Sequence, residues 1–103
     1  MSQGLNGREK DYAVSVTETA TESWQALDHI QDLLAIESLI QSEADKGKIE
    51  PIISRRVEQL ANEIDTHIKI INTAMLGIHN RAVIDIAAKV KDDLRELKQL
   101  LLR

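Results

Sequence analysis

The sequence predicts an all-α protein, a three-helix antiparallel bundle made of a long helical hairpin and an N-terminal helix. Three observations lead to this class. Aliphatic residues recur at three- and four-residue spacing over most of the 103 residues. Turn-forming residues interrupt this spacing at two places, and no two alternating segments are joined by a hairpin turn. A chain of this length forms one domain with one modest core.

Residues 1–11 contain Gly4, Gly7 and mixed charges with little apolar content. Such a composition cannot bury enough apolar surface to offset the entropy of ordering. We expect a disordered N-terminal arm here, which leaves residues 12–103 as a single helical domain.

Residues 12–17 fit two patterns. In an extended chain Tyr12, Val14 and Val16 share one face, but Val16 also begins a helical series that continues at Ala20. Strand, helix start and coil all remain open. A strand would need a second chain, most simply the same segment of a second copy in a β-ribbon. Paired strands followed by helices are also the element order of some DNA-binding proteins.

The first helix is predicted over residues 16–45. Ser15 and Glu18 have the spacing of a capping box, and Gly47 is a suitable residue to end the helix. Leu33–Ile36 is apolar over a wide arc, and such helices are usually covered on more than one side. This observation predicts that homodimerisation completes the bundle.

The second and third helices are predicted over residues 51–76 and 80–102, as an antiparallel hairpin. Pro51 suits the first position of a helix, Gly77 can end one in the left-handed conformation, and Asn80 can cap the next. The second helix has an aliphatic series at helical spacing: Ile53, Val57, Leu60, Ile64, Ile68, Ile71 and Met75. The third helix has Val83, Ile86, Val90, Leu94, Leu97 and Leu101.

Every charged residue from Asp11 to Asp45 is acidic. Glu18 with Glu22, and Asp28 with Asp32, are like-charge pairs at i, i+4 spacing, which destabilise a helix slightly. These four residues either offer an acidic face to a basic partner or are neutralised by the other helices, and the sequence favours neutralisation. The residues available for it include Lys69, Arg81, Lys89 and Lys91.

A basic cluster, Lys46, Lys48, Arg55 and Arg56, surrounds the predicted loop into the second helix. Cations in the first turns of a helix are disfavoured by its dipole, so an acidic partner could offset this cost. Neutralisation by nearby acidic residues is the favoured alternative, and those residues are Glu43, Asp45, Glu50 and Glu58.

Catalytic and metal-binding patterns are not found. The chain has no Cys, and its three His residues form neither a Glu-x-x-His nor an HExxH pattern. Phosphate-binding and nucleophile motifs are missing as well. We therefore expect no catalytic residue, no metal, no cofactor and no small-molecule substrate.

The expected function is a non-enzymatic helical protein–protein interaction module: a small adaptor, chaperone or regulator that acts through helix faces as a homodimer. Trp24, Leu33, Leu34 and Ile36 are the predicted interface anchors. The alternative is a nucleic-acid-associated regulator that uses an N-terminal β-ribbon or the basic residues around 46–56. No apolar segment approaches the roughly 20 residues of a membrane span, no secretory signal is recognised, and a cytoplasmic location is expected.

Overall fold

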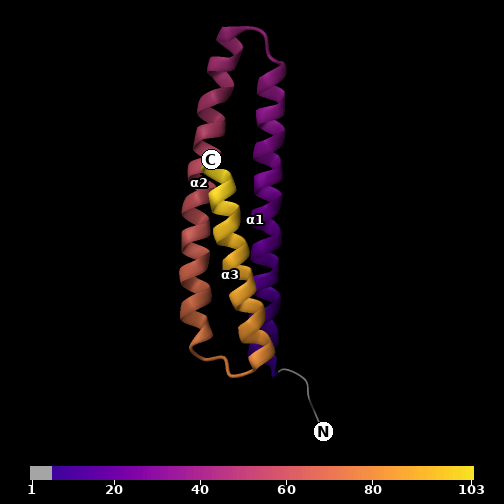
Figure 1. Cartoon of the computed structure of the whole chain (residues 1–103), viewed down its shortest axis with the longest axis vertical. Coiled ribbons are helices and arrows are strands. Elements are labelled where there is room, and N and C mark those ends of the chain that lie inside the picture. The colour runs from indigo at the N-terminus through magenta and orange to yellow at the C-terminus, as the bar shows by residue number, and fades with distance from the viewer. Residues whose placement is uncertain (1–5) are drawn as a thin grey trace.

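The computed structural model describes residues 6–103 and contains three helices in that part: α1 (Gly7–Leu39), α2 (Glu43–Met75) and α3 (Arg81–Leu101). Consecutive helices run antiparallel in a rod with principal extents of 65, 21 and 18 Å (Figure 1). Each helix packs against both of the others. The prediction of an all-α three-helix bundle is confirmed.

The first helix begins nine residues earlier than predicted. The Asn6 side chain caps it by accepting a hydrogen bond from the Glu9 backbone N–H at 2.8 Å. Gly7 to Asp11 are therefore helical, which corrects the predicted arm over 1–11 for those residues, and residues 1–5 lie outside the described residues.

Residues 12–17, for which strand, helix start and coil were all possible from the sequence, are helical. The predicted cap at Ser15 is wrong, because the helix already passes through it. Thr17 and Thr19 donate their hydroxyls to the carbonyls four residues back, Ala13 O and Ser15 O, at 2.8 and 2.9 Å. A threonine satisfied in this way is accommodated inside a helix, so β-branched residues do not convert the segment into a strand.

The connection between α1 and α2 is also displaced from its predicted position. It consists of Ile40–Ser42, and the Ser42 hydroxyl caps α2 by accepting from the Asp45 N–H at 3.4 Å. Gly47 and Pro51, predicted at the end of one helix and the start of the next, both lie inside α2. Pro51 leaves the Gly47 carbonyl without its helical donor, and water can bind this carbonyl because both residues are exposed.

The break between the second and third helices lies where it was predicted. Asn80 caps α3 by accepting from the Ala82 and Val83 N–H groups at 3.0 and 3.3 Å. Gly77 does not adopt the predicted left-handed conformation, since no described residue has a positive φ. A Cβ at Gly77 would instead meet the Arg8 guanidinium, 2.9 Å from its Cζ.

The start of α1 holds the α2–α3 turn in place. The Glu9 carboxylate accepts hydrogen bonds from the backbone N–H groups of Asn80 at 2.8 Å and His79 at 3.3 Å. One turn later the Tyr12 hydroxyl donates to the Ile71 carbonyl at 2.8 Å. Two residues of α1 thus bind backbone groups about 60 to 70 positions away, close to the same end of the rod.

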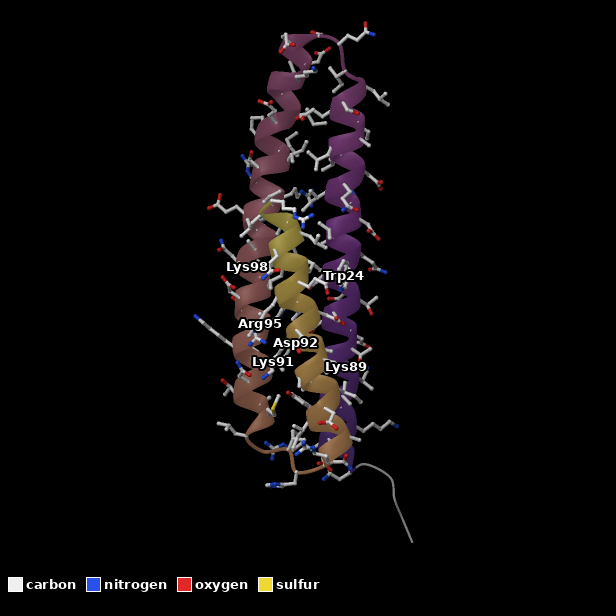
Figure 2. All side chains as sticks on the ribbon, viewed as in Figure 1. Trp24, Lys89, Lys91, Asp92, Arg95 and Lys98 are labelled. Atoms are coloured by element: carbon white, nitrogen blue, oxygen red, sulfur yellow. The ribbon has the colours of Figure 1, made fainter. Side chains whose placement is uncertain are left out.

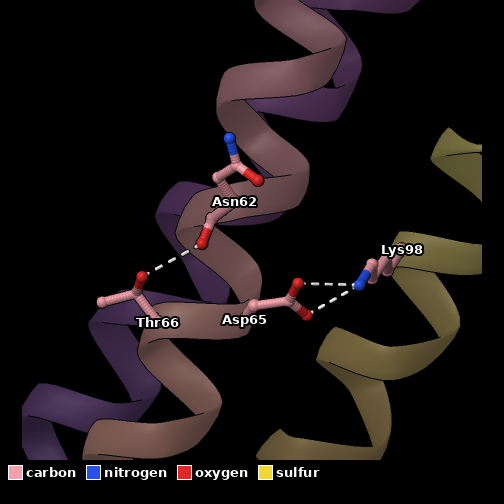
Figure 3. Close-up of polar contacts among 4 residues, drawn as sticks. All are labelled: Asn62, Asp65, Thr66 and Lys98. Atoms are coloured by element: carbon pink, nitrogen blue, oxygen red, sulfur yellow. Dashed lines mark hydrogen bonds and ion pairs between the residues drawn. The ribbon is translucent and has the colours of Figure 1, made fainter.

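The core is a single aliphatic cluster along the bundle axis. Ile64, Leu94 and Leu97 are fully buried, as their helical spacing predicts. At the border of α2 and α3, Lys98 Nζ lies 2.7 Å from Asp65 Oδ1 (Figure 3). Both side chains are partly exposed, so this pair fixes the relative register of the two helices more than it stabilises them.

Unequal helix lengths leave one end of the molecule with two helices only. α1 and α2 each have 33 residues and α3 has 21, a difference of about 18 Å at 1.5 Å per residue. Figure 1 shows α3 ending part of the way along the rod, while α1 and α2 continue together to their loop.

Candidate interaction surface

Two shallow grooves run along the side of the α1–α2 hairpin that faces away from α3. Their volumes are about 330 and 270 Å³, and every lining residue belongs to α1 or α2. Small side chains such as Ser15, Ala26 and Ala74 keep the grooves open. We call this side the α1–α2 face; it extends over Asp11–Ile30 of α1 and Arg56–Ala74 of α2.

Beyond the end of α3 the same stripes become aliphatic. After Ile30, the positions of α1 and its C-cap that follow at intervals of three or four residues are aliphatic. The positions of α2 that precede Arg56 at the same intervals are aliphatic as well. We call these the hairpin-end patch: Leu33, Ile36, Ile40, Ile49 and Ile52. Ile36 is 50% exposed and Ile52 is 49% exposed, and the other three are partly exposed.

The predicted anchors fall into three different environments. Trp24 is half-buried and packs against the core, so it stabilises the fold. Leu34, which is 46% exposed, lines a separate groove of about 520 Å³ at the end of α3. Only Leu33 and Ile36 belong to the hairpin-end patch.

The four predicted acidic residues, Glu18, Glu22, Asp28 and Asp32, are all exposed on α1. Within residues 6–103 no Lys, Arg or His nitrogen lies within 4.0 Å of their carboxylates. The neutralising contacts favoured by the sequence are therefore not formed. Two of the expected donors are engaged elsewhere: Arg81 pairs with Asp85 and Lys91 donates to Asn72.

The predicted basic residues are spread over the first half of α2 instead of surrounding a loop. Lys46 and Lys48 lie close to Glu43 and Asp45, at 4.0 and 3.9 Å, as the favoured alternative expected. Arg55 and Arg56 are exposed and have no acidic partner within 4.0 Å in the part of the chain that the structure describes. They lie more than two turns from the start of α2, so the dipole argument for an anion site no longer applies.

Another groove, about 630 Å³, lies between α2 and α3. Its cations are largely satisfied within the chain, since Lys98 pairs with Asp65 and Arg95 with Asp92 (Figures 2 and 3). The Lys98–Asp65 pair spans the groove, whereas Arg95 pairs with a residue of its own helix.

Burial raises the pKa of the Tyr12 hydroxyl, because the phenolate would lose hydration. Among residues 6–103 no three His, Asp or Glu side chains come together in a way that could hold a metal ion. Nor does any described helix combine the length and apolarity that crossing a membrane requires.

The predicted interface anchors did not include Ile40, Ile49 or Ile52, and Ile49 was expected to lie in the loop between the first two helices. The signal that identifies them is the Ser42–Asp45 cap, which starts α2 early enough to make Ile49 and Ile52 part of a helical stripe.

Comparison with protein-family models, curated proteins and solved structures finds no match to this chain.

Proposed function

We propose that this protein is a non-enzymatic interaction module that binds protein through the α1–α2 face and its hairpin-end patch. One observation carries the proposal: beyond α3, two long helices present aliphatic side chains to water. Clustered exposed apolar residues with a polar rim are typical of protein interaction sites. Three of the large aliphatic side chains that are exposed lie in this two-helix end: Ile36, Leu39 and Ile52.

The charges around the patch support the same proposal. Asp28 and Asp32 precede Ile36 on α1, while Arg55 and Arg56 follow Ile52 on α2. These side chains are exposed and make no ion pair in residues 6–103. An apolar centre with unpaired charges at its edge gives a partner both binding area and orientation.

The nucleic-acid alternative gains no specific support. Its β-ribbon requires a strand at residues 12–17, which are helical. Its basic residues Lys46 and Lys48 lie beside acidic neighbours. The adaptor, chaperone or regulator role and the cytoplasmic location remain predictions from the sequence.

A photo-crosslinking amino acid at Ile36 or Ile52 tests the proposal in cells that make the protein. We expect discrete protein adducts from both positions. The matched control places the same amino acid at exposed Lys89 on α3 and should yield none. Adducts that are absent, or equally strong from Lys89, would refute the proposed surface.

A further inference from the structure

We propose that the α1–α2 face binds a second copy of this chain, about a twofold axis parallel to the helices, so that α1 of each copy packs on α2 of the other. This inference rests on the proposed function and names its partner. Its physical basis is that the hairpin-end patch is apolar on both helices and that the charges at its edge are complementary under this axis.

The face is accessible and large enough for such a contact. α3 packs on the opposite side of the hairpin, as the grooves lined only by α1 and α2 indicate. Together with the hairpin-end patch, the face extends from Asp11 to Ile40, about 44 Å at 1.5 Å per residue. With a width of about 15 Å it offers on the order of 650 Å² per copy, at the low end of the roughly 600–1,000 Å² per partner of a stable interface.

The apolar part of the contact is supplied by the hairpin-end patch. A parallel twofold axis places Ile36 of one copy close to Ile49 and Ile52 of the other, because these residues lie at the same level of the hairpin. Antiparallel packing of α1 and α2 sets this level: one groove is lined by His29 and Ile30 together with Arg56. Ile36 then lies about one and a half turns further along α1, and Ile52 and Ile49 one and two turns back along α2.

Charge decides the direction of the axis. Asp32 lies one turn before Ile36, and Arg55 and Arg56 lie one turn after Ile52, so these residues also occupy one level. An axis parallel to the helices brings Asp32 of each copy to Arg55 and Arg56 of the other, twice per dimer. An axis perpendicular to the helices would place α1 on α1 and acid on acid, which is unfavourable.

A charge exchange tests both the partner and the axis. The variants are Asp32→Arg, Arg55→Asp, and the two changes in one chain. Neither side chain makes an intrachain ion pair in residues 6–103, so folding, checked by circular dichroism, is retained. The control is Asp93→Arg, the same charge change at an exposed site on α3.

Sedimentation equilibrium measures the dimer dissociation constant. We expect the wild type and Asp93→Arg to dimerise equally, and each single variant to dimerise at least about tenfold more weakly, since two attractive contacts become repulsive. A mixture of the two single variants should form heterodimers in native mass spectrometry. The chain with both changes should recover the homodimer.

Three results would overturn the inference. A wild type that stays monomeric at all concentrations excludes a second copy, and if Ile36 or Ile52 still crosslinks to a different protein, the proposed function survives alone. If Asp32→Arg makes the dimer bind more tightly, the twofold axis is perpendicular to the helices. A dimer unaffected by both single variants uses another surface.

Discussion

The contact between Glu9 and the α2–α3 turn gives the most direct test of how this chain is held together. Replacing Glu9 by Ala removes the acceptor of two backbone N–H groups, those of Asn80 at 2.8 Å and His79 at 3.3 Å. A hydrogen bond to a charged group contributes about 1.5–3 kcal/mol net. The turn is partly open to water, which can replace the carboxylate, and the 3.3 Å contact is weak. We therefore expect the free energy of unfolding to fall by about 1–2 kcal/mol.

Urea denaturation followed by helical circular dichroism measures this change, at a fixed protein concentration because any self-association adds to stability. Glu9→Gln keeps a neutral acceptor and should lose about half as much. Asp11→Ala is the matched control, because Asp11 is an exposed acid in the same part of α1. In hydrogen exchange, the Asn80 and His79 amides should be deprotected in Glu9→Ala only. If Glu9→Ala and Asp11→Ala agree within about 0.3 kcal/mol, the contact does not hold the turn.

Four further predictions concern glycine, core and tyrosine positions. Gly47→Ala should stabilise the chain by about 0.5–1 kcal/mol, because its Cβ points into open space within α2. Gly77→Ala should change stability by less than about 0.5 kcal/mol, because the end of the flexible Arg8 side chain can move away from the new Cβ. A left-handed glycine would instead cost about 1 kcal/mol or more, so a loss of that size by urea denaturation contradicts the observed φ. Leu97→Ala, at a fully buried position, should cost about 3 kcal/mol, while Leu39→Ala, 79% exposed, should be nearly neutral; equal midpoints in thermal melts would contradict the core assignment. For Tyr12 the folded pKa is raised above its usual value of about 10, so the folded state disfavours the phenolate and stability declines as the pH rises above 10 through the folded pKa. Tyr12→Phe should lose less stability than the wild type over that range, and the tyrosinate absorbance of this sole Tyr should appear at higher pH in the folded than in the urea-unfolded chain.

Helical periodicity was sufficient to predict the core, because burial in a bundle depends mainly on which residues share a face. Ile64, Leu94 and Leu97 were placed in the seams from spacing alone, and all three are fully buried. Asn80 was identified as a cap for a similarly local reason: its side chain reaches N–H groups only two and three residues away.

The helix boundaries could not be predicted as well, because their determinants compete or lie far away in the sequence. At the α1–α2 connection, Gly47 and Pro51 are strong helix-ending signals, yet the Ser42 cap and the burial of Ile53 outweigh them. At the start of α1, Glu9 binds the turn 70 residues later, and no local pattern contains that contact.

The interaction surface was predicted only in part for a related reason. The apolar arc of Leu33–Ile36 indicated that α1 needs covering on more than one side, but the sequence does not specify which side of α1 faces α3. Ile36 and Ile52 continue the side of the hairpin that faces away from α3, so α3 does not cover them and both stay about half exposed. Nothing within residues 6–103 buries this aliphatic stripe of α1 and α2. For this reason we propose that another molecule buries it.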